Sequence, residues 1–246
     1  MYVDRTYRET FSAKDLVPFR VVIKDSDMMI LVDKESYVPE LPKKAEQITR
    51  FYRTQLEDYI MRDPIFKTTL EPHLAYEDAP PIALEMVKAG NSCGVGPMAA
   101  VAGAMAERVG RALLKKVKEV IVENGGDLFL CIKKPRIVGI FAGQSPFSDK
   151  LALKVYPGES PLGLCTSSGT VGPSLSFGKA DAVVIAAPSA ALADAAATAV
   201  GNLIQTKDDV VKGVEAAKRI KGVTGVLVIK DDRLSAWGDI EIVPRA

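Results

Sequence analysis

The apolar positions of this 246-residue chain form short β-type runs and longer helical stripes. Apolar runs at residues 19–23 and 28–32 flank the polar segment 24–27, and this arrangement predicts a β-hairpin near the N-terminus. From Pro42 onward, apolar side chains recur at helical spacing until Asp63 and Pro64 interrupt the pattern. The stripe predicts a long helix that packs one face against a core.

Two further predicted helices carry many small side chains. One begins at Pro97 and extends to about residue 116, and the other follows the capping residue Ser189 and extends to about residue 204. Alanine and glycine cover much of both helices, so another backbone or a flat ligand can approach them closely. Two more helices are predicted, over residues 81–89, ending at Gly90, and over residues 208–220.

Short β-rich runs separated by Gly, Pro and Ser make up most of the remaining chain. They occupy residues 137–141, 151–155, 162–165, 182–187, 223–229 and 234–243. Runs of this length with turn residues between them favour a mostly antiparallel or mixed sheet. No linker or low-complexity segment divides the chain. The sequence therefore predicts one α+β domain over residues 1–246, a single compact unit with room for two lobes.

Charge and hydropathy exclude several classes of partner. The 32 basic residues nearly balance the 31 acidic ones and are scattered along the chain, so we expect neither nucleic-acid binding nor a basic membrane patch. Residues 1–10 carry charges where a signal peptide has its apolar core. No apolar run approaches the roughly 18 residues of a membrane span. We therefore expect a cytoplasmic protein with a small-molecule ligand.

The histidine and cysteine counts narrow the chemistry further. His73 is the only histidine of the sequence, which excludes zinc sites built from several histidines in one chain, and we expect it at the surface. The cysteines are Cys93, Cys131 and Cys165, without a C-x-x-C pair, and we expect them to be reduced thiols. A metal ion, if one binds, is then expected to be a hard cation held by oxygen atoms.

The segment Glu123 to Asp127 places a polar, glycine-containing turn between two apolar runs. Gly125 and Gly126 allow positive φ angles and close approach of a ligand, while Asn124 and Asp127 offer hydrogen-bonding groups. Two glycines in succession are equally typical of an ordinary hairpin turn. The turn alone therefore leaves a binding site and a simple hairpin as open alternatives.

The loop from Cys93 through Gly94 to Gly96 precedes the predicted helix at Pro97. Glycines expose the backbone, and a helix N-terminus presents unpaired N–H groups, which together predict a site for an anion such as phosphate. The loop lacks the Walker A and dinucleotide-binding fingerprints. The alternative is a glycine turn that only allows the helix to pack.

Asp194 and Thr198 lie four residues apart, on one face of the alanine-rich helix that follows Ser189. A carboxylate among alanines needs a partner, which could be the Thr198 hydroxyl, a backbone N–H or a cation. A carboxylate, a hydroxyl, carbonyl oxygens and water would together make a suitable shell for Mg²⁺.

Four short motifs occur in a recognisable order between residues 90 and 205. They are N-G-G-D at 124–127, T-S-S-G at 166–169, A-P-S at 187–189 and A-D-A-A-A-T at 193–198, after the glycine loop at 93–96. In this order the chain resembles the ApbE superfamily of flavin transferases, and it most resembles the superfamily's cytoplasmic branch in anaerobic archaea and bacteria. The resemblance implies cleavage of FAD with Mg²⁺ and transfer of FMN to a threonine or serine of a partner protein.

The resemblance also implies a set of site residues. It implies that Asp194 and Asp127 are catalytic residues and that Asp194 and Thr198 bind Mg²⁺. Binding of FAD, FMN or another phosphate-containing ligand falls on Cys93, Gly94, Gly96, Asn124, Gly125, Gly126, Thr166, Ser167 and Ser168. The chain departs from the family pattern at Met98 and Ala99, where the family has lysine and glycine. It also departs at residues 172–178, where the family has the segment H-x-x-D-P-x-T-G and this chain does not.

Two other hypotheses are compatible with the sequence. Cys93 and Cys165 lie in predicted glycine-rich loops, and a thiolate lowered in pKa by a helix N-terminus would suit sulfur transfer, as in sulfide assimilation and homocysteine formation. The third hypothesis is a protein that binds the ligand without turnover. The small-residue helices could pack within one chain or between two copies, so a homo-oligomer is a further expectation.

Overall fold

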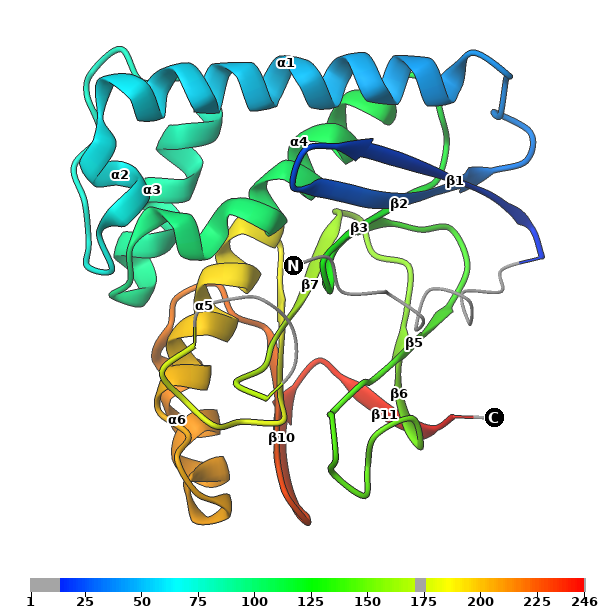
Figure 1. Cartoon of the computed structure of the whole chain (residues 1–246). Helices are drawn as coiled ribbons and strands as arrows, with labels where there is room; N and C mark the ends of the chain where they lie inside the picture. The colour runs from blue at the N-terminus through cyan, green and yellow to red at the C-terminus, as the bar shows by residue number, and fades with distance from the viewer. Residues whose placement is uncertain (1–13, 171–175, 246) are drawn as a thin grey trace.

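An antiparallel sheet runs through the middle of the fold (Figure 1). The structure is a computed structural model that describes residues 14–170 and 176–245. Within these residues the sheet has eight strands, which in spatial order are β1 Leu16–Ile23, β2 Ser26–Asp33, β3 Val120–Asn124, β4 Asp127–Cys131, β7 Leu162–Ser167, β8 Ala182–Ala187, β9 Gly225–Lys230 and β10 Arg233–Gly238. Each strand is antiparallel to its neighbours.

The two halves of this sheet repeat one arrangement, in which a hairpin is followed by helices and then by a second hairpin. The helices of the first half are α1 Leu41–Arg62, α2 Pro64–Thr68, α3 Pro81–Cys93 and α4 Val101–Leu113, and those of the second half are α5 Ala190–Asn202 and α6 Val210–Arg219. None of the helices within residues 14–170 and 176–245 is long and apolar enough to cross a membrane.

Because neighbouring strands alternate in direction, the C-terminal ends of β1, β3, β7 and β9 all lie at the same end of the sheet. The hairpin turn Gly125–Gly126, the residues that follow β7 and the hairpin turn at Asp231 therefore all lie at this end of the sheet. The topology thus brings several polar segments, far apart in sequence, to one end of the molecule.

Different layers cover the two faces of the large sheet (Figure 1). Along β8, Val183 and Ile185 pack in the core beneath the helices, whereas Val184 and Ala186 pack on the opposite face. In the described residues that opposite face is covered by a three-stranded sheet of β11 Glu241–Pro244, β6 Leu151–Val155 and β5 Arg136–Gly139. The predicted α+β fold with a mostly antiparallel sheet is confirmed.

Helix α5 packs closely on both α4 and β7, and glycine makes this possible. A methyl group added to Gly103 of α4 would lie 2.2 Å from the carbonyl oxygen of Ala190. One added to Gly163 of β7 would lie 2.4 Å from the Cα atom of the same alanine. The expected close approach of backbones at the small-residue helices is therefore confirmed, and it occurs within one chain.

Several expected element boundaries are wrong. The helix expected to end at Gly90 continues to Cys93, and the helix expected from Pro97 begins as a 3₁₀ segment, Pro97–Ala100, before α4. The apolar run at 234–243 forms two strands, β10 and β11, which belong to different sheets.

His73 is not the surface residue that the sequence suggested. Its side chain is 14% exposed, and its Nε2 atom lies 2.7 Å from Oδ2 of the buried carboxylate Asp63. The hydroxyl of Tyr59 donates to the same oxygen at 3.0 Å. His73 therefore joins the loop that precedes α3 to the end of α1.

Candidate functional site

The alternation of side chains along β4 and β7 determines which of the predicted residues meet. Phe129 of β4 and Cys165 of β7 belong to the core beneath the helices. Residues two positions away along a strand point to the same face. Asp127 and Ser167 therefore face the helices, and α5 lies across them.

The turn at Gly125 and Gly126 is a hairpin turn between β3 and β4. The φ angles are +72° and +102°, in the left-handed region that glycine adopts without strain. Asn124, at the end of β3, donates through its side-chain amide to the carbonyl oxygen of Ala102 at 3.1 Å. The segment is thus a hairpin, and the amide attaches the hairpin tip to the first turn of α4.

Asp194 of α5 faces the same turn of α4. Its Oδ2 atom accepts a hydrogen bond of 2.9 Å from the backbone N–H of Gly103, one of the N–H groups that a helix leaves unpaired at its start. Of the partners considered for this carboxylate, the structure provides the backbone N–H. Thr198 lies one helical turn further along α5 and is half-buried.

Glu107 of α4 makes the reciprocal contact, and no pattern in the sequence indicated this role. Its Oε2 atom accepts hydrogen bonds from the Ala190 N–H at 2.7 Å and from the Ser189 hydroxyl at 2.9 Å, at the start of α5. Arg111 donates to its other oxygen at 2.8 Å. Each helix thus supplies a carboxylate to the N-terminus of the other, which fixes Asp194 against α4.

Among the described residues, no lysine or arginine is paired with either Asp127 or Asp194, the two carboxyl groups of the site. Burial and the nearby charge of Asp194 raise the pKa of Asp127 well above its ordinary value. Burial raises the pKa of Asp194 to about 7, against the opposing effect of the Gly103 N–H. Neither carboxyl forms an ion pair with a lysine or arginine in the described part of the chain. The Oδ1 atom of Asp127 is buried and accepts no hydrogen bond there.

The loop from Cys93 to Gly96 differs from the expected anion site. Gly94 has a φ of +72° and ends α3, with its N–H directed at the Asn91 carbonyl oxygen. The N–H of Gly96 donates to Leu70, and a methyl group at this glycine would lie 2.0 Å from the carbonyl oxygen of Thr69. The loop caps a helix and packs closely, so these N–H groups are not available to an anion.

The cysteines do not have the properties of reactive thiolates. Cys93 is the last residue of α3 and so lies at a helix C-terminus, and burial together with the charge of Asp194 raises the pKa of its thiol to about 12. Cys165 is fully buried and lies 3.3 Å from the carbonyl oxygen of Ala190. Burial and the charge of Asp127 raise the pKa of its thiol as well. This geometry disfavours the sulfur-transfer hypothesis.

The three predicted residues at the end of β7 do not share one surface. Thr166 pairs with Val184, whose side chain packs on the face away from the helices, so Thr166 points away from Asp194. Ser167 points toward α5, with its hydroxyl beside Gly201. Ser168 follows the strand, and its hydroxyl lies 3.3 Å from that of Thr170. Residues 171–175, which include part of the family's H-x-x-D-P-x-T-G position, lie outside the described residues.

The remaining cluster is composed of oxygen donors. No group of three or more His, Cys, Asp or Glu side chains positioned for a metal ion occurs in residues 14–170 and 176–245. The site contains two carboxyls, of Asp127 and Asp194, and the half-buried hydroxyl of Thr198. Such a set suits a hard cation that keeps water or phosphate oxygens among its ligands, as Mg²⁺ does.

Comparison with known proteins places the chain in a family that matches most of its length. The family model described as "AbpE bacteria" matches residues 8–223. A UPF0280 protein of Methanosarcina acetivorans is 42% identical over 226 residues, which cover 91% of this chain and 87% of that protein. A UPF0280 protein of Methanocaldococcus jannaschii is 41% identical over 226 residues and 90% of each chain.

Solved structures share the fold at low sequence identity. The flavinyl transferase ApbE of Pseudomonas stutzeri in its apo form superposes with a TM-score of 0.59 at 13% identity, over 91% of this chain and 94% of that one. The ApbE protein of Thermotoga maritima gives a TM-score of 0.53 at 14% identity, over 92% and 96%. The chain therefore has the ApbE fold, and it belongs to the family described as AbpE bacteria.

Proposed function

We propose that this chain binds a flavin nucleotide, or another ligand with a pyrophosphate group, together with Mg²⁺ where α4, α5 and the β3–β4 hairpin meet. The observation that carries the proposal is the proximity of buried Asp127 and half-buried Asp194, neither of which is paired with a lysine or arginine in residues 14–170 and 176–245. Carboxyls removed from water are ordinarily paired or bound to a metal, and a cation here would stabilise the ionised form of both. The flavin itself is suggested by the ApbE structures that share the fold.

The residues present fit the implied cation. In this proposal the second oxygen of Asp194 and the hydroxyl of Thr198 hold Mg²⁺, while the Gly103 N–H orients the Asp194 carboxylate. When bound, Mg²⁺ would polarise the phosphate oxygens and balance the charge that develops on them. Gly125 and Gly126 have no side chains to obstruct a ligand at the hairpin tip.

The reaction we propose is displacement at the phosphorus atom of the FMN half of FAD. The oxygen of an acceptor serine or threonine, or of water, forms a bond to this phosphorus, the bridging P–O bond breaks, and AMP leaves. The carboxyl of Asp127, whose pKa burial raises, would accept the hydroxyl proton in this reaction. The products are protein-bound or free FMN, AMP and a proton.

Incubation of the purified protein with FAD and Mg²⁺, followed by chromatography for FMN and AMP, tests this function. We expect both products in equal amounts, and a rate about 100-fold lower for Asp194→Asn, which keeps the hydrogen bond to Gly103 but removes the negative charge. Asp149→Asn, at an exposed carboxylate paired with Arg245, should retain the rate. Absence of both FAD binding and cleavage would contradict the proposal, and binding without cleavage would identify a non-catalytic binding protein.

A further inference from the structure

A second polar site lies at the same end of the large sheet, and the proposed function does not use it. It is a cavity of about 740 Å³ between the loop that joins β5 to β6, the residues after β7, the residue before β8 and the β9–β10 hairpin. Its lining residues are Gly143, Gln144, Ser145, Pro146, Thr170, Asp181, Lys207, Lys230, Asp231 and Asp232. A volume of this size is within the range of roughly 300–1,000 Å³ that small-molecule sites occupy.

Asp181 and Lys230 are the least exposed charged groups of the cavity. Their side chains are 7% and 13% exposed, and the Lys230 ammonium lies 3.6 Å from Oδ2 of Asp181. The same ammonium lies 2.7 Å from Oδ1 of Asp231. A carboxylate and an ammonium are therefore held side by side at the inner end of the cavity.

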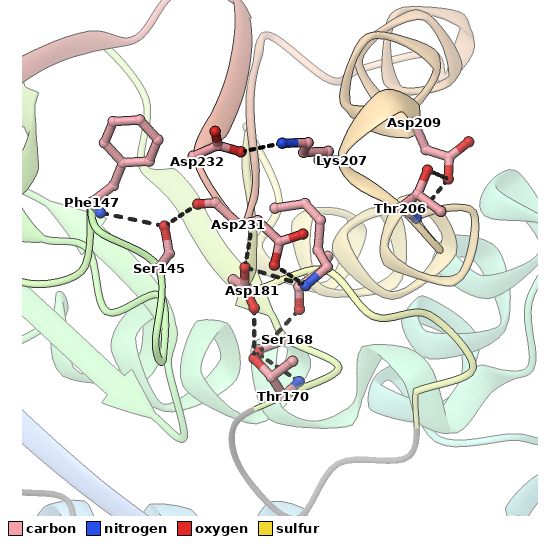
Figure 2. A network of polar contacts seen from close by, with 12 residues as sticks. Ser145, Phe147, Ser168, Thr170, Asp181, Thr206, Lys207, Asp209, Asp231 and Asp232 are labelled. Carbon is pink, nitrogen blue, oxygen red and sulfur yellow. Dashed lines mark hydrogen bonds and ion pairs between the residues drawn. The ribbon is translucent and has the colours of Figure 1, made fainter.

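A network of hydrogen bonds holds Asp181 in one orientation (Figure 2). Its Oδ1 atom accepts from the Thr170 hydroxyl at 3.2 Å, and its Oδ2 atom accepts from the Asp231 N–H at 2.6 Å. Ser145 donates to the Asp231 carbonyl oxygen at 2.7 Å and joins the β5–β6 loop to this network. Because an ionised carboxylate has about four acceptor positions, Asp181 keeps acceptor capacity for a ligand.

The charges of the lining disfavour an anionic ligand. Three aspartates face two lysines, and both ammonium groups are already paired, Lys230 with Asp231 and Lys207 with Asp232 at 2.9 Å. A phosphate would therefore meet an excess of negative charge. A ligand that carries hydroxyl groups avoids this repulsion, because a hydroxyl donates to a carboxylate and accepts from an ammonium.

From this arrangement we propose that the cavity binds the vicinal diol of a ribose ring, with Asp181 accepting from one ring hydroxyl and Lys230 donating to the other. A fixed carboxylate that accepts from ribose hydroxyls is a recurring device in nucleotide-binding proteins. The ligand class is a ribose-bearing group such as a nucleoside. The site is separate from the carboxyl groups proposed to hold Mg²⁺ and needs neither metal nor phosphate.

Titration of the full-length protein with adenosine in metal-free buffer, followed by NMR or calorimetry, tests the inference. We expect adenosine to bind, 2′,3′-dideoxyadenosine to bind at least about tenfold more weakly, and inorganic phosphate not to compete. Because the buffer contains neither Mg²⁺ nor a phosphate ester, failure here is distinguishable from failure of the proposed FAD chemistry.

Two variants locate the binding. Gln144→Trp, at an exposed position of the lining, should fill the cavity and weaken adenosine binding at least about tenfold, whereas Gln47→Trp, exposed on α1, should not change it. Asp181→Asn should also weaken binding, but it disturbs the hydrogen bond to Asp231, so Gln144→Trp is the decisive variant. Equal binding of adenosine and its dideoxy analogue, an unchanged affinity in Gln144→Trp, or no adenosine binding up to about 10 mM would each overturn the inference.

Discussion

Replacement of Gly163 by alanine is expected to lower the free energy of unfolding by about 3 kcal/mol. The new methyl group would lie 2.4 Å from the Cα atom and 2.5 Å from the nitrogen of Ala190, the first residue of α5. These are backbone atoms, held in place by the hydrogen bond that the Ala190 N–H donates to Glu107, so the clash cannot be relieved by a change of side-chain rotamer. Helix α5 must move instead, and Asp194 moves with it.

Urea unfolding measured for the wild type and the variant checks this expectation. Gly158→Ala is a matched control, because the nearest atom to its added methyl group would be 3.5 Å away, an ordinary contact distance. The control should change the free energy of unfolding by no more than about 0.5 kcal/mol. Equal stability of Gly163→Ala and Gly158→Ala would contradict the close contact of α5 with β7.

Stability in metal-free buffer should decrease as the pH rises from about 4 to about 7, and Asp194 should account for about 2–4 kcal/mol of that decrease. The folded-state pKa of Asp194, about 7, lies above its ordinary value of 3.8. Between these values the unfolded chain has released the proton and the folded chain retains it, so each increase in pH favours the unfolded state. Above pH 7 both states are ionised and this contribution becomes constant. Partial exposure of Asp194 favours the lower end of the range.

Unfolding at pH 4.5, 6 and 8 for the wild type and Asp194→Asn measures this contribution. Asparagine keeps an oxygen for the Gly103 N–H but does not titrate, so the variant should gain in stability relative to the wild type as the pH rises. Asp149→Asn, at an exposed position, should follow the wild type. A difference between wild type and Asp194→Asn that stays constant across this range would show that Asp194 is not held in a desolvating site.

Most helices and strands could be predicted from the sequence, because each depends on a pattern within a few neighbouring residues. The stripe that became α1, the β1–β2 hairpin and the start of α5 at Ser189 depend on spacing, turn residues and a cap. The end of α3 was misplaced because Gly90 has a packing role: a side chain there would lie 2.7 Å from the carbonyl oxygen of Val95. The glycine that ends the helix is Gly94.

The site was predicted only in part, because its decisive contacts join residues distant in sequence. The motif that contains Asp194 was visible, but its partner Gly103 lies 91 positions earlier in the chain. Glu107 could be recognised only once α4 and α5 were seen to exchange carboxylates at their N-termini. That Thr166 and Ser167 point to opposite faces of the sheet could be seen only from the register of β7 against β8. The cavity at Asp181 was missed because separate segments of the chain form it.

Binding of Mn²⁺, a paramagnetic substitute for Mg²⁺, tests the proposed cation site, and it can be followed by electron paramagnetic resonance. We expect the wild type to bind Mn²⁺ in competition with Mg²⁺, and Asp127→Asn and Asp194→Asn each to weaken binding by about 10- to 100-fold. Asp149→Asn should bind as the wild type does. Mn²⁺ affinity that is absent in the wild type, or unchanged in both cluster variants, would contradict a cation site between the β3–β4 hairpin and α5.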